Sequence, residues 1–236
     1  MNKKVIVENL PKMAYKATWE YQESLFEPIV KQKITNKNDQ TSTPTTNYLL
    51  FCEHQDVYTI GKSGKMENLL LSEQELATQN IEFYKINRGG DITYHGIGQL
   101  VGYPILDLDN FKPDIHLYMR NLEEVIILTI ADFGLAGGRI EGLTGVWLDY
   151  QAGAKNPRKI CAAGVKASRW VTMHGFALNV NTDLSFFQNI VPCGITDKAV
   201  TSMKQELGKD IPLKEVEKSI ILHFEKVFGA ECVRNF

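Results

Sequence analysis

The sequence predicts one α/β (α+β) domain built around a mixed β-sheet. Segments with strand-like alternation are interspersed with segments of helical periodicity, an order that favours helices flanking a sheet. The chain has 236 residues, 44% of them hydrophobic, which suffices for one large core. No internal repeat or linker-like block divides the sequence, so we expect a single domain over residues 1–236.

The composition excludes several functional classes. A net charge of −2 gives no reason to expect nucleic-acid binding or a membrane surface. The amino-terminal apolar run is too short for a signal peptide, and no stretch is long and apolar enough to span a membrane. Four cysteines without a CxxC pair suggest free thiols and a cytoplasmic protein. The histidines show no HxH or HExxH spacing, so no metal site is expected.

The amino-terminal half is expected to contain most of the strands. A short strand at 5–7 precedes a helix at 15–30, which Pro28 should kink or end. Residues 31–47 are almost devoid of apolar side chains and predict a mobile surface loop. Ser72 and Glu75 form a capping box that opens a short helix. Further strands are predicted at 48–52, within 54–61, at 81–86 and at 99–106.

The carboxy-terminal half predicts the longest helix, at 114–133, and a pair of adjacent strands. The inward residues of that helix should be Leu117, Leu122, Val125, Ile126 and Ile130. A strand at 145–150 is followed by paired strands at 159–166 and 170–180, with the turn at 168–169. Helices are predicted at 199–207 and at 212–228, the second with a proline in its first turn.

Residues 158–195 combine two reactive groups with an unusual number of small residues. The stretch reads RKICAAGVKASRWVTMHGFALNVNTDLSFFQNIVPCGI, with Lys159 near its start and Cys193 near its end. Small residues inside strands usually mark a close approach of a ligand or another backbone. The pattern therefore predicts a strand-lined slot, with a lysine at one end and a thiol on the loop that returns to it.

A second stretch, RGGDITYHGIGQ at 88–99, joins two predicted strands and is rich in glycine and hydrogen-bonding side chains. It fits neither the GxGxxG fingerprint of dinucleotide-binding proteins nor a GxxxxGK[ST] phosphate loop. A plain hairpin would not need arginine, tyrosine, histidine and glutamine together. We therefore favour a ligand-binding segment, with the glycine-rich hairpin as the alternative.

Three separate motifs resemble those of the lipoyl(octanoyl) transferase family. They read RGGDITYHGIGQLVGYPILDL, RKICAAGVKASRWVTMHGFALNV and VPCGI, and HQDVYTIGK adds a fourth point of similarity. Members of that family are octanoyl-[acyl carrier protein]:protein N-octanoyltransferases, related to the biotin and lipoate protein ligases. The resemblance implies a biotin/lipoate protein ligase-like catalytic domain, with a mixed sheet flanked by helices and a small second sheet.

The resemblance also implies roles for individual residues. Cys193 matches the acyl-bearing nucleophile of the family, and Lys159 matches the lysine that activates it. The implied substrate-binding residues are Arg88, Gly89, Gly90, Asp91, Ile92, Thr93, Tyr94 and His95, then Ala162, Ala163 and Gly164, and finally Gly175, Phe176 and Ala177. The chain departs from the family pattern at Ile97, where proline is common, and at Cys161 and Ala163, where alanine and isoleucine are common.

The implied activity is octanoyl transfer through a cysteine thioester, the first step of endogenous protein lipoylation. The implied donor is octanoyl-acyl carrier protein. The implied acceptors are lysines on the lipoyl domains of 2-oxoacid dehydrogenase complexes and on the glycine-cleavage H protein. Exchange between thioesters is nearly isoenergetic and amide formation from a thioester is downhill, so no cofactor or ATP is expected.

Four points stay open on the sequence alone. An ATP-dependent lipoate or biotin ligase would share the fold, and a non-catalytic module could hold an acylated carrier in the same slot. Cys161 rivals Cys193 as nucleophile, because alternation along a strand places it on the same face as Lys159. Six basic residues form either a solvated face or a rim that docks an acidic carrier: Lys62, Lys65, Lys155, Arg158, Lys166 and Arg169.

Overall fold

The computed structural model describes residues 1–191 and 199–234. Within them the helices are α1 (Tyr15–Asn38), α2 (Glu73–Thr78), α3 (Ile115–Asp132), α4 (Met203–Leu207) and α5 (Leu213–Phe228). The strands are β1 (Lys4–Asn9), β2 (Asn47–Cys52), β3 (Val57–Ile60), β4 (Glu82–Lys85), β5 (Ile92–His95), β6 (Gln99–Ile105), β7 (Gly137–Ile140), β8 (Leu143–Leu148), β9 (Arg158–Ser168), β10 (Val171–Asn179), β11 (Ala199–Val200) and β12 (Glu231–Arg234).

A large mixed sheet forms the centre of the molecule. Its strand order in the described residues is β12-β1-β2-β6-β10-β9-β8-β7, with the short β11 paired to β9. Strand β1 runs parallel to both β2 and β12, whereas β6, β10, β9 and β8 are joined by antiparallel pairing. Strands β9 and β10 form the long hairpin predicted at 159–180, with Gly164 opposite Gly175.

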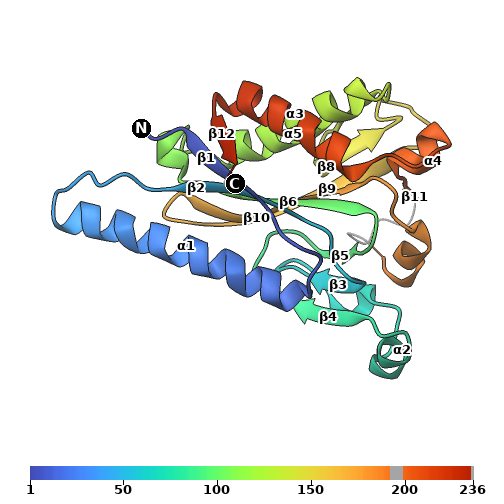
Figure 1. Cartoon of the computed structure of the whole chain (residues 1–236). Coiled ribbons are helices and arrows are strands. Elements are labelled where there is room, and N and C mark those ends of the chain that lie inside the picture. The colour runs from blue at the N-terminus through green and yellow to red at the C-terminus, as the bar shows by residue number, and fades with distance from the viewer. Residues whose placement is uncertain (192–198, 235–236) are drawn as a thin grey trace.

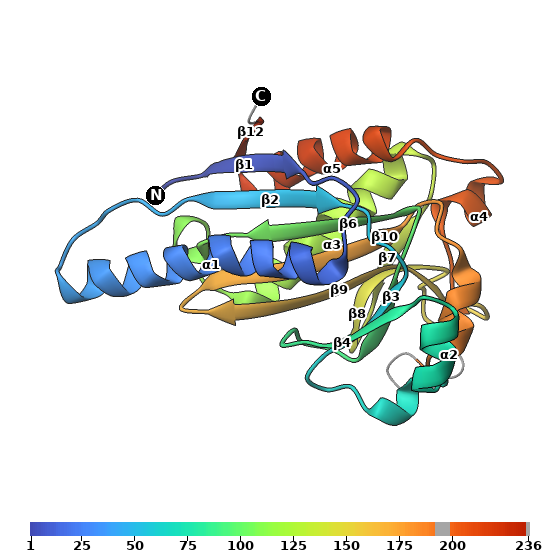
Figure 2. The same cartoon turned by 60° about the horizontal axis from the view of Figure 1, so that its bottom comes forward.

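Helices cover both faces of this sheet (Figure 1). Helices α3 and α5 lie on one face, where side chains such as Leu122, Ile126, Ile220 and Phe224 join the main core cluster. Helix α1 lies on the opposite face, and its Phe26 and Ile29 pack against β2, β6 and β10. The turned view in Figure 2 shows α1 running along the strands of the sheet.

A second, three-stranded sheet has the order β4-β3-β5 and lies beside the start of α1 (Figure 1). Its core contains Tyr58, Ile60, Ile92 and Tyr94, and the predicted capping box of α2 is present at Ser72. The expected architecture, a mixed sheet flanked by helices plus a small second sheet, is therefore confirmed.

Helix α1 corrects the prediction of a mobile loop over residues 31–47. The helix continues through Pro28 to Asn38, so the first half of the expected loop is helical. Contacts distant in sequence hold this extension, because Lys33 forms ion pairs with Asp107 and Asp109. The rest of the segment is also tied down: the Thr45 hydroxyl donates to Asp107 Oδ2 at 2.7 Å. These contacts cannot be predicted from residues 31–47 alone, because their partners lie elsewhere in the sequence.

Three smaller differences concern turns and short elements. The β9–β10 turn lies one residue later than predicted, at Arg169 and Trp170, both with positive φ. The helix expected at 199–207 is the short strand β11 followed by α4, which begins after its cap Ser202. The glycine-rich segment contains a strand of its own, β5, whose Ile92 pairs with Ile60.

Candidate functional site

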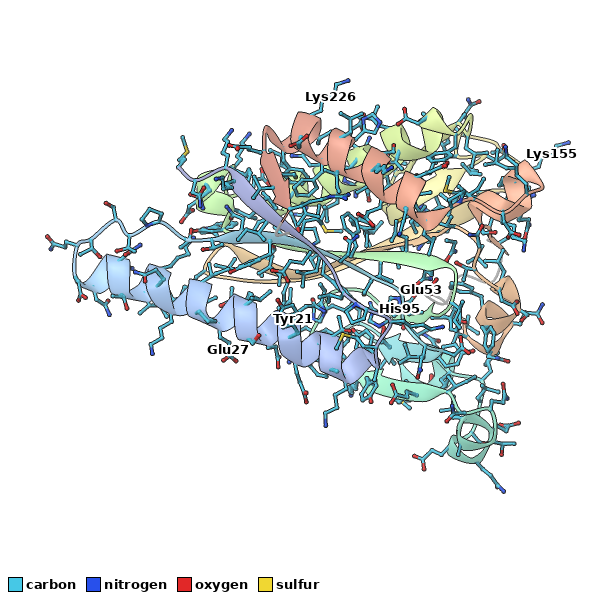
Figure 3. All side chains as sticks on the ribbon, in the orientation of Figure 1. Tyr21, Glu27, Glu53, His95, Lys155 and Lys226 are labelled. Atoms are coloured by element: carbon cyan, nitrogen blue, oxygen red, sulfur yellow. The ribbon has the colours of Figure 1, made fainter. Side chains whose placement is uncertain are left out.

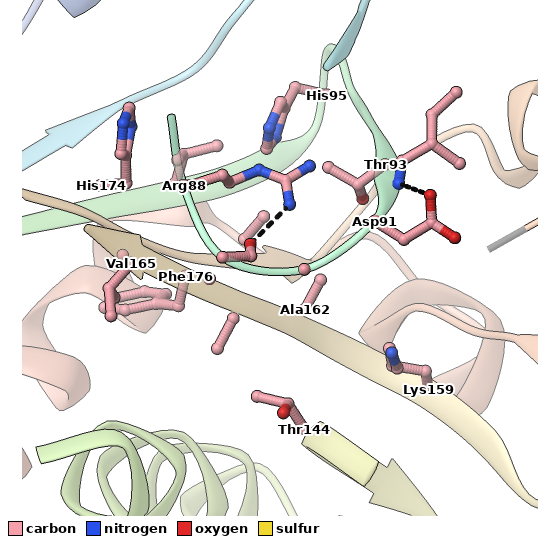
Figure 4. Close-up of a pocket in the computed structure, with 18 of the residues that line it drawn as sticks. Arg88, Asp91, Thr93, His95, Thr144, Lys159, Ala162, Val165, His174 and Phe176 are labelled. Atoms are coloured by element: carbon pink, nitrogen blue, oxygen red, sulfur yellow. Dashed lines mark hydrogen bonds between the residues drawn. The ribbon is translucent and has the colours of Figure 1, made fainter. Parts of the chain in front are cut away.

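A cavity of about 530 Å³ lies between the large sheet and the segment 88–95 (Figure 4). Its size is within the usual range for small-molecule sites. Strands β9 and β10 supply its floor, and β8, α3 and β11 supply further lining residues. Lys159 and all of the predicted substrate-binding residues except Tyr94 line this cavity.

Glycine allows the segment 88–91 to lie directly on β9. The Gly89 N–H donates to the carbonyl of Val165 at 2.9 Å, an edge contact between loop and strand. A Cβ at Gly164 would come within 2.7 Å of the Gly89 carbonyl oxygen, so the approach requires a residue without a side chain. The small residues noted in the sequence thus mark a contact between two parts of the site.

Arg88 and Asp91 fix the conformation of the same segment. Arg88 is buried, and its Nη2 donates to the carbonyl and the hydroxyl of Thr59 at 2.9 and 3.1 Å. The Asp91 carboxylate accepts hydrogen bonds from Asn68 Nδ2 and from the Ile92 N–H, each at 2.6 Å. Polar side chains therefore hold the segment in place before any ligand binds.

Tyr94 is the exception among the residues predicted to bind substrate. Its ring is buried in the small sheet and stacks on Phe186 at a centroid distance of 4.8 Å. Its hydroxyl donates to Asp56 Oδ1 at 2.6 Å. Alternation along β5 explains the difference, because Tyr94 points into the small core while its neighbours Thr93 and His95 line the cavity.

Lys159 lies near the start of β9, directly opposite Trp147 of β8. Its Nζ is 4.7 Å from the centroid of the Trp147 ring. Strand β11 runs parallel to this part of β9, and the Thr201 N–H donates to the Lys159 carbonyl at 2.9 Å. The lysine side chain thus enters the cavity from a strand whose backbone is paired on both sides.

Cys193 lies in 192–198, outside the described residues, but both flanks of that segment are placed. On the amino-terminal side, the Val191 N–H donates to the Asn68 carbonyl at 2.8 Å, and Asn68 also binds Asp91. On the carboxy-terminal side, Ala199 and Val200 of β11 line the cavity beside Lys159. Of the two flanks, β11 lines the cavity itself, and Val191 is linked to the lining residue Asp91 through Asn68.

Cys161 is placed elsewhere. Its thiol is 1% exposed, belongs to the main core cluster and donates to the Ala162 carbonyl at 3.5 Å. Burial raises the pKa of this thiol, which disfavours the nucleophilic thiolate. A register irregularity in the β8–β9 pairing interrupts simple alternation between Lys159 and Cys161. The expectation that both residues share one face is therefore wrong.

Two buried histidines, His95 and His174, line the cavity. His95 Nδ1 lies 2.8 Å from Gln99 Oε1, and Gln99 Nε2 donates to Asn179 Oδ1 at 2.9 Å. Asn179 in turn donates to the Thr201 carbonyl at 3.0 Å, which links His95 to the strand beside Lys159. Burial lowers the pKa of His95 well below its usual value, so the ring is neutral. Figure 3 shows His95 inside the molecule, whereas Lys155 projects from its edge.

His174 lines the cavity in a backbone conformation that is uncommon for its residue type. Its φ is +60°, and its backbone N–H donates to Gln22 Oε1 of α1 at 3.0 Å. Burial, followed by the charges of Arg88 and Lys166, lowers its pKa to about 3. Neither ring nitrogen has a hydrogen-bond partner among the described residues. His174 is therefore a neutral, buried imidazole among the residues that line the cavity.

Several lining residues carried no signal in the sequence. Five come from segments outside the motifs, and three lie inside the motif stretches without having been singled out: Tyr15, Met119, Leu143, Thr144 and Trp147, and then Tyr103, Asn179 and Phe187. Their patterns in sequence are those of ordinary core or loop residues, and only the tertiary fold brings them to the cavity. Two further findings concern the described residues alone. No cluster of three or more His, Cys, Asp or Glu could hold a metal ion, and no helix is suited to crossing a membrane.

Comparison with known proteins places this geometry in a family. The lipoyl protein ligase A/B catalytic domain profile matches residues 14–225. Christiangramia forsetii octanoyltransferase is 61% identical over 232 residues, covering 98% of each chain. Flavobacterium johnsoniae octanoyltransferase is 60% identical over 234 residues, covering 99% of this chain and 100% of the relative.

Solved structures share the fold at low sequence identity. A putative lipoate protein ligase from T. acidophilum with bound lipoic acid superposes with a TM-score of 0.70 at 16% identity, covering 100% of this chain and 89% of the other. A lipoate-protein ligase A bound with ATP superposes with a TM-score of 0.68 at 18% identity, with the same coverage. On the profile match and the close relatives, the chain belongs to the lipoyl protein ligase A/B catalytic domain family.

Proposed function

We propose that the protein transfers an octanoyl group from octanoyl-acyl carrier protein to the acceptor lysine of a lipoyl domain, through a thioester on Cys193. The two octanoyltransferases described above match this chain over nearly their whole length. Their names support octanoyl as the group that is transferred. The proposed acceptors are the lipoyl domains of 2-oxoacid dehydrogenase complexes and the glycine-cleavage H protein. The cytoplasmic location expected from the sequence is part of the same proposal.

The observation that carries the proposal is that Lys159 lines the cavity next to β11, the strand that directly follows the segment containing Cys193. Val191 is tied to the first substrate segment through Asn68, and Val200 is paired with Lys159 itself. Seven residues, 192–198, separate Val191 from Ala199, which lines the cavity. Among the other cysteines, Cys161 and Cys52 are buried in the core, which leaves them poorly suited to attack a bulky thioester.

The chemistry begins with an ion pair. A free thiol has a pKa near ~8.5, so only a few per cent is ionised at pH 7, and a neighbouring ammonium favours the thiolate. In the first half-reaction the Cys193 thiolate attacks the donor thioester carbonyl and the carrier's C–S bond breaks. The departing sulfur takes a proton from Lys159, which becomes a neutral amine. The product is octanoyl-Cys193 and a free carrier thiol.

The second half-reaction restores the enzyme. The acceptor lysine amine attacks the carbonyl of octanoyl-Cys193, forming an amide bond as the C–S bond to Cys193 breaks. Lys159, now neutral, takes the proton that the amine must lose. Cys193 returns to a thiolate and Lys159 to an ammonium, so atoms and charges balance without a nucleotide. A ligase on the same fold would instead activate a free acid with ATP.

The direct test is transfer without nucleotide. Octanoyl-acyl carrier protein and a lipoyl domain are incubated with the enzyme, with and without ATP, and the mass of the lipoyl domain is followed. The proposal predicts an octanoyl gain at equal rates in both conditions, and its loss in Cys193→Ala. Free octanoate with ATP should give no product. Product only from octanoate and ATP would establish the ligase alternative instead.

A further inference from the structure

Trp147 and Lys159 form a cross-strand pair that faces the cavity. The two residues are directly opposite each other in the β8–β9 register, while Val146 is opposite Cys161. The register irregularity lies between these two pairs, and the two pairs face different surroundings. Val146 and Cys161 belong to the main core cluster, whereas Trp147 and Lys159 both line the cavity.

The contact between them depends on the charge of the lysine. Lys159 Nζ lies 4.7 Å from the centroid of the indole ring, and the ring is only 2% exposed. An aromatic ring face attracts an ammonium through its quadrupole, and the attraction strengthens where water is excluded. A neutral amine gains nothing comparable. The ring therefore favours the protonated form of Lys159. Burial has the opposite effect, because it favours the neutral amine.

Several charged side chains of the described residues lie on elements around this part of the cavity and make contacts of their own. Glu123 of α3 binds Arg139 and the Gly145 N–H, at 3.0 and 2.9 Å. Glu206 of α4 forms a two-pronged pair with Arg158, and Asp91 binds Asn68 and its own segment. Among the described residues, Arg88 and Arg158 are cationic groups of the same region, and both oppose a further positive charge.

We propose that Trp147 is a positioning residue that keeps the Lys159 side chain charged and directed into the cavity. This inference rests on the proposed function, in which the Lys159 ammonium is the acid of the first half-reaction. Acylation then requires both a thiolate and an ammonium, so its rate should show a bell-shaped dependence on pH. The alkaline limb reports loss of the ammonium from the coupled pair.

The test compares Trp147→Leu and Trp147→Phe with Trp170→Leu, a matched control on the exposed β9–β10 turn. Acylation of Cys193 by a small octanoyl thioester is followed by intact mass across pH. Trp147→Leu should move the alkaline limb to lower pH by roughly 0.5–1 unit, since it removes the cation–π contact. Trp147→Phe keeps an aromatic ring, so its alkaline limb should lie close to the pH of the wild-type limb. The control should match the wild type.

Two results would overturn the inference. A rate that falls equally at all pH values, with the limb unmoved, would show that Trp147 only packs. Equal shifts in the Phe and Leu variants would assign the effect to the indole N–H, which has no partner among the described residues. Absence of any adduct on Cys193 in the wild type is a separate outcome, because it removes the proposed function itself.

Fluorinated tryptophan provides a measurement that does not depend on the Leu variant folding. The chain has three tryptophans, so a Trp19→Phe, Trp170→Phe background leaves Trp147 as the labelled ring. Fluorine weakens the negative ring face with little change in shape, and cation–π strength should fall with each added fluorine. The alkaline limb of the pH–rate profile should therefore move to lower pH with each added fluorine. A limb indifferent to fluorination would contradict the inference.

Discussion

Lys159 acts twice in the proposed mechanism, first as an acid and then as a base. It is half-buried at the cavity wall, with its backbone held by β8 on one side and β11 on the other. Replacing it with alanine removes both proton transfers and the charge that favours the thiolate. The backbone pairing does not depend on the side chain, so the fold should survive.

Lys159→Ala should therefore slow octanoyl transfer by about 10²–10⁴-fold, the usual contribution of a general acid–base group. The rate of Cys193 alkylation by iodoacetamide, measured against pH, should also shift to higher pH. Lys155→Ala, on the exposed turn before β9, is the control and should behave as wild type. Full activity with an unchanged alkylation profile would remove Lys159 from the mechanism.

Ala163 is the residue at which the substrate segment departs from its family pattern. It lines the cavity and also packs against the main core cluster. Because a larger aliphatic residue would reduce the room for an acyl tail, Ala163→Ile should raise the preference for octanoyl over decanoyl. Each extra methylene of substrate gains at most ~0.8 kcal/mol, a factor of about four.

Competition between octanoyl and decanoyl carrier proteins measures that preference. The native protein should accept decanoyl within a small factor of octanoyl, and the Ile variant should discriminate more strongly. Ala162→Ile is an informative comparison on the neighbouring position of β9. Equal rejection of decanoyl by the native protein and by Ala163→Ile would show that Ala163 does not limit chain length.

Helix α1 covers a group of buried imidazoles, and this arrangement predicts how stability depends on pH. Tyr15 of α1 lies 5.1 Å from the ring of His54 and 5.7 Å from that of His95, centroid to centroid. His54 is fully buried, and its Nε2 is 2.7 Å from the Tyr103 hydroxyl. Burial lowers the pKa of His54 to about 4.

The sign of the pH effect follows from that shift. Above the unfolded value of ~6.5, His54 is neutral in both states and its contribution to stability is complete. As pH falls from 6.5 towards 4, only the unfolded state gains the proton, so the free energy of unfolding decreases by up to about 3 kcal/mol. His95 and His174, also buried and neutral, should add to this loss.

Urea unfolding between pH 7 and 4.5 checks this prediction. His54→Gln keeps a group that can bond the Tyr103 hydroxyl but does not titrate, so its free energy of unfolding should fall less steeply with acidification. His116→Gln changes an exposed helix residue and should leave the slope unaltered. Identical slopes for wild type and His54→Gln would show that this imidazole does not drive the acid sensitivity.

Some helices and strands can be predicted from their own sequences, and others cannot. Helix α5 was well predicted because Val216, Ile220, Phe224 and Phe228 repeat at helical spacing, and its signals are local. The β9–β10 hairpin and the glycine-rich segment were predicted for the same reason. The last third of α1, residues 31–38, is not predicted, because Lys33 there forms ion pairs with two aspartates 74 and 76 positions away. The bulge that separates Lys159 from Cys161 also leaves no mark in sequence.

The site, too, has features that local sequence predicts and features that depend on distant contacts. Glycines and small residues marked the two segments that form the floor and cover of the cavity. The pairing of Trp147 with Lys159 depends on strand register, which a single strand does not encode. The place of Tyr94 in a motif predicts a substrate-binding role, although its side chain points into the small core.

At the scale of the whole molecule, the six basic residues are spread over several elements. Arg158 and Lys166 lie at opposite ends of β9, eight residues and roughly 26 Å apart. Arg158 is paired with Glu206, and Lys166 lies over the Phe26 ring. Lys62 and Lys65 are exposed beside the cavity, since the Lys62 N–H donates to the Arg88 carbonyl at 3.0 Å.

Lys62 and Lys65 should therefore carry most of the attraction for an acidic carrier protein. The double change Lys62→Glu, Lys65→Glu should raise KM for octanoyl-acyl carrier protein by about tenfold at low salt, with less effect as salt is added. KM for a small octanoyl thioester should not change. Lys226→Glu, on the far helix α5 (Figure 3), is the control. Equal effects on both donors would argue against carrier docking at this surface.

The central claim is that Cys193, activated by Lys159, carries the octanoyl group. The most direct measurement is the intact mass of the enzyme after brief incubation with octanoyl-acyl carrier protein and no acceptor, followed by peptide mapping. One octanoyl group should be added, located on Cys193, absent in Cys193→Ala and retained in Cys161→Ala. Addition of the lipoyl domain should discharge it. An octanoyl group mapped to Cys161, or transfer that proceeds in Cys193→Ala, would contradict the claim.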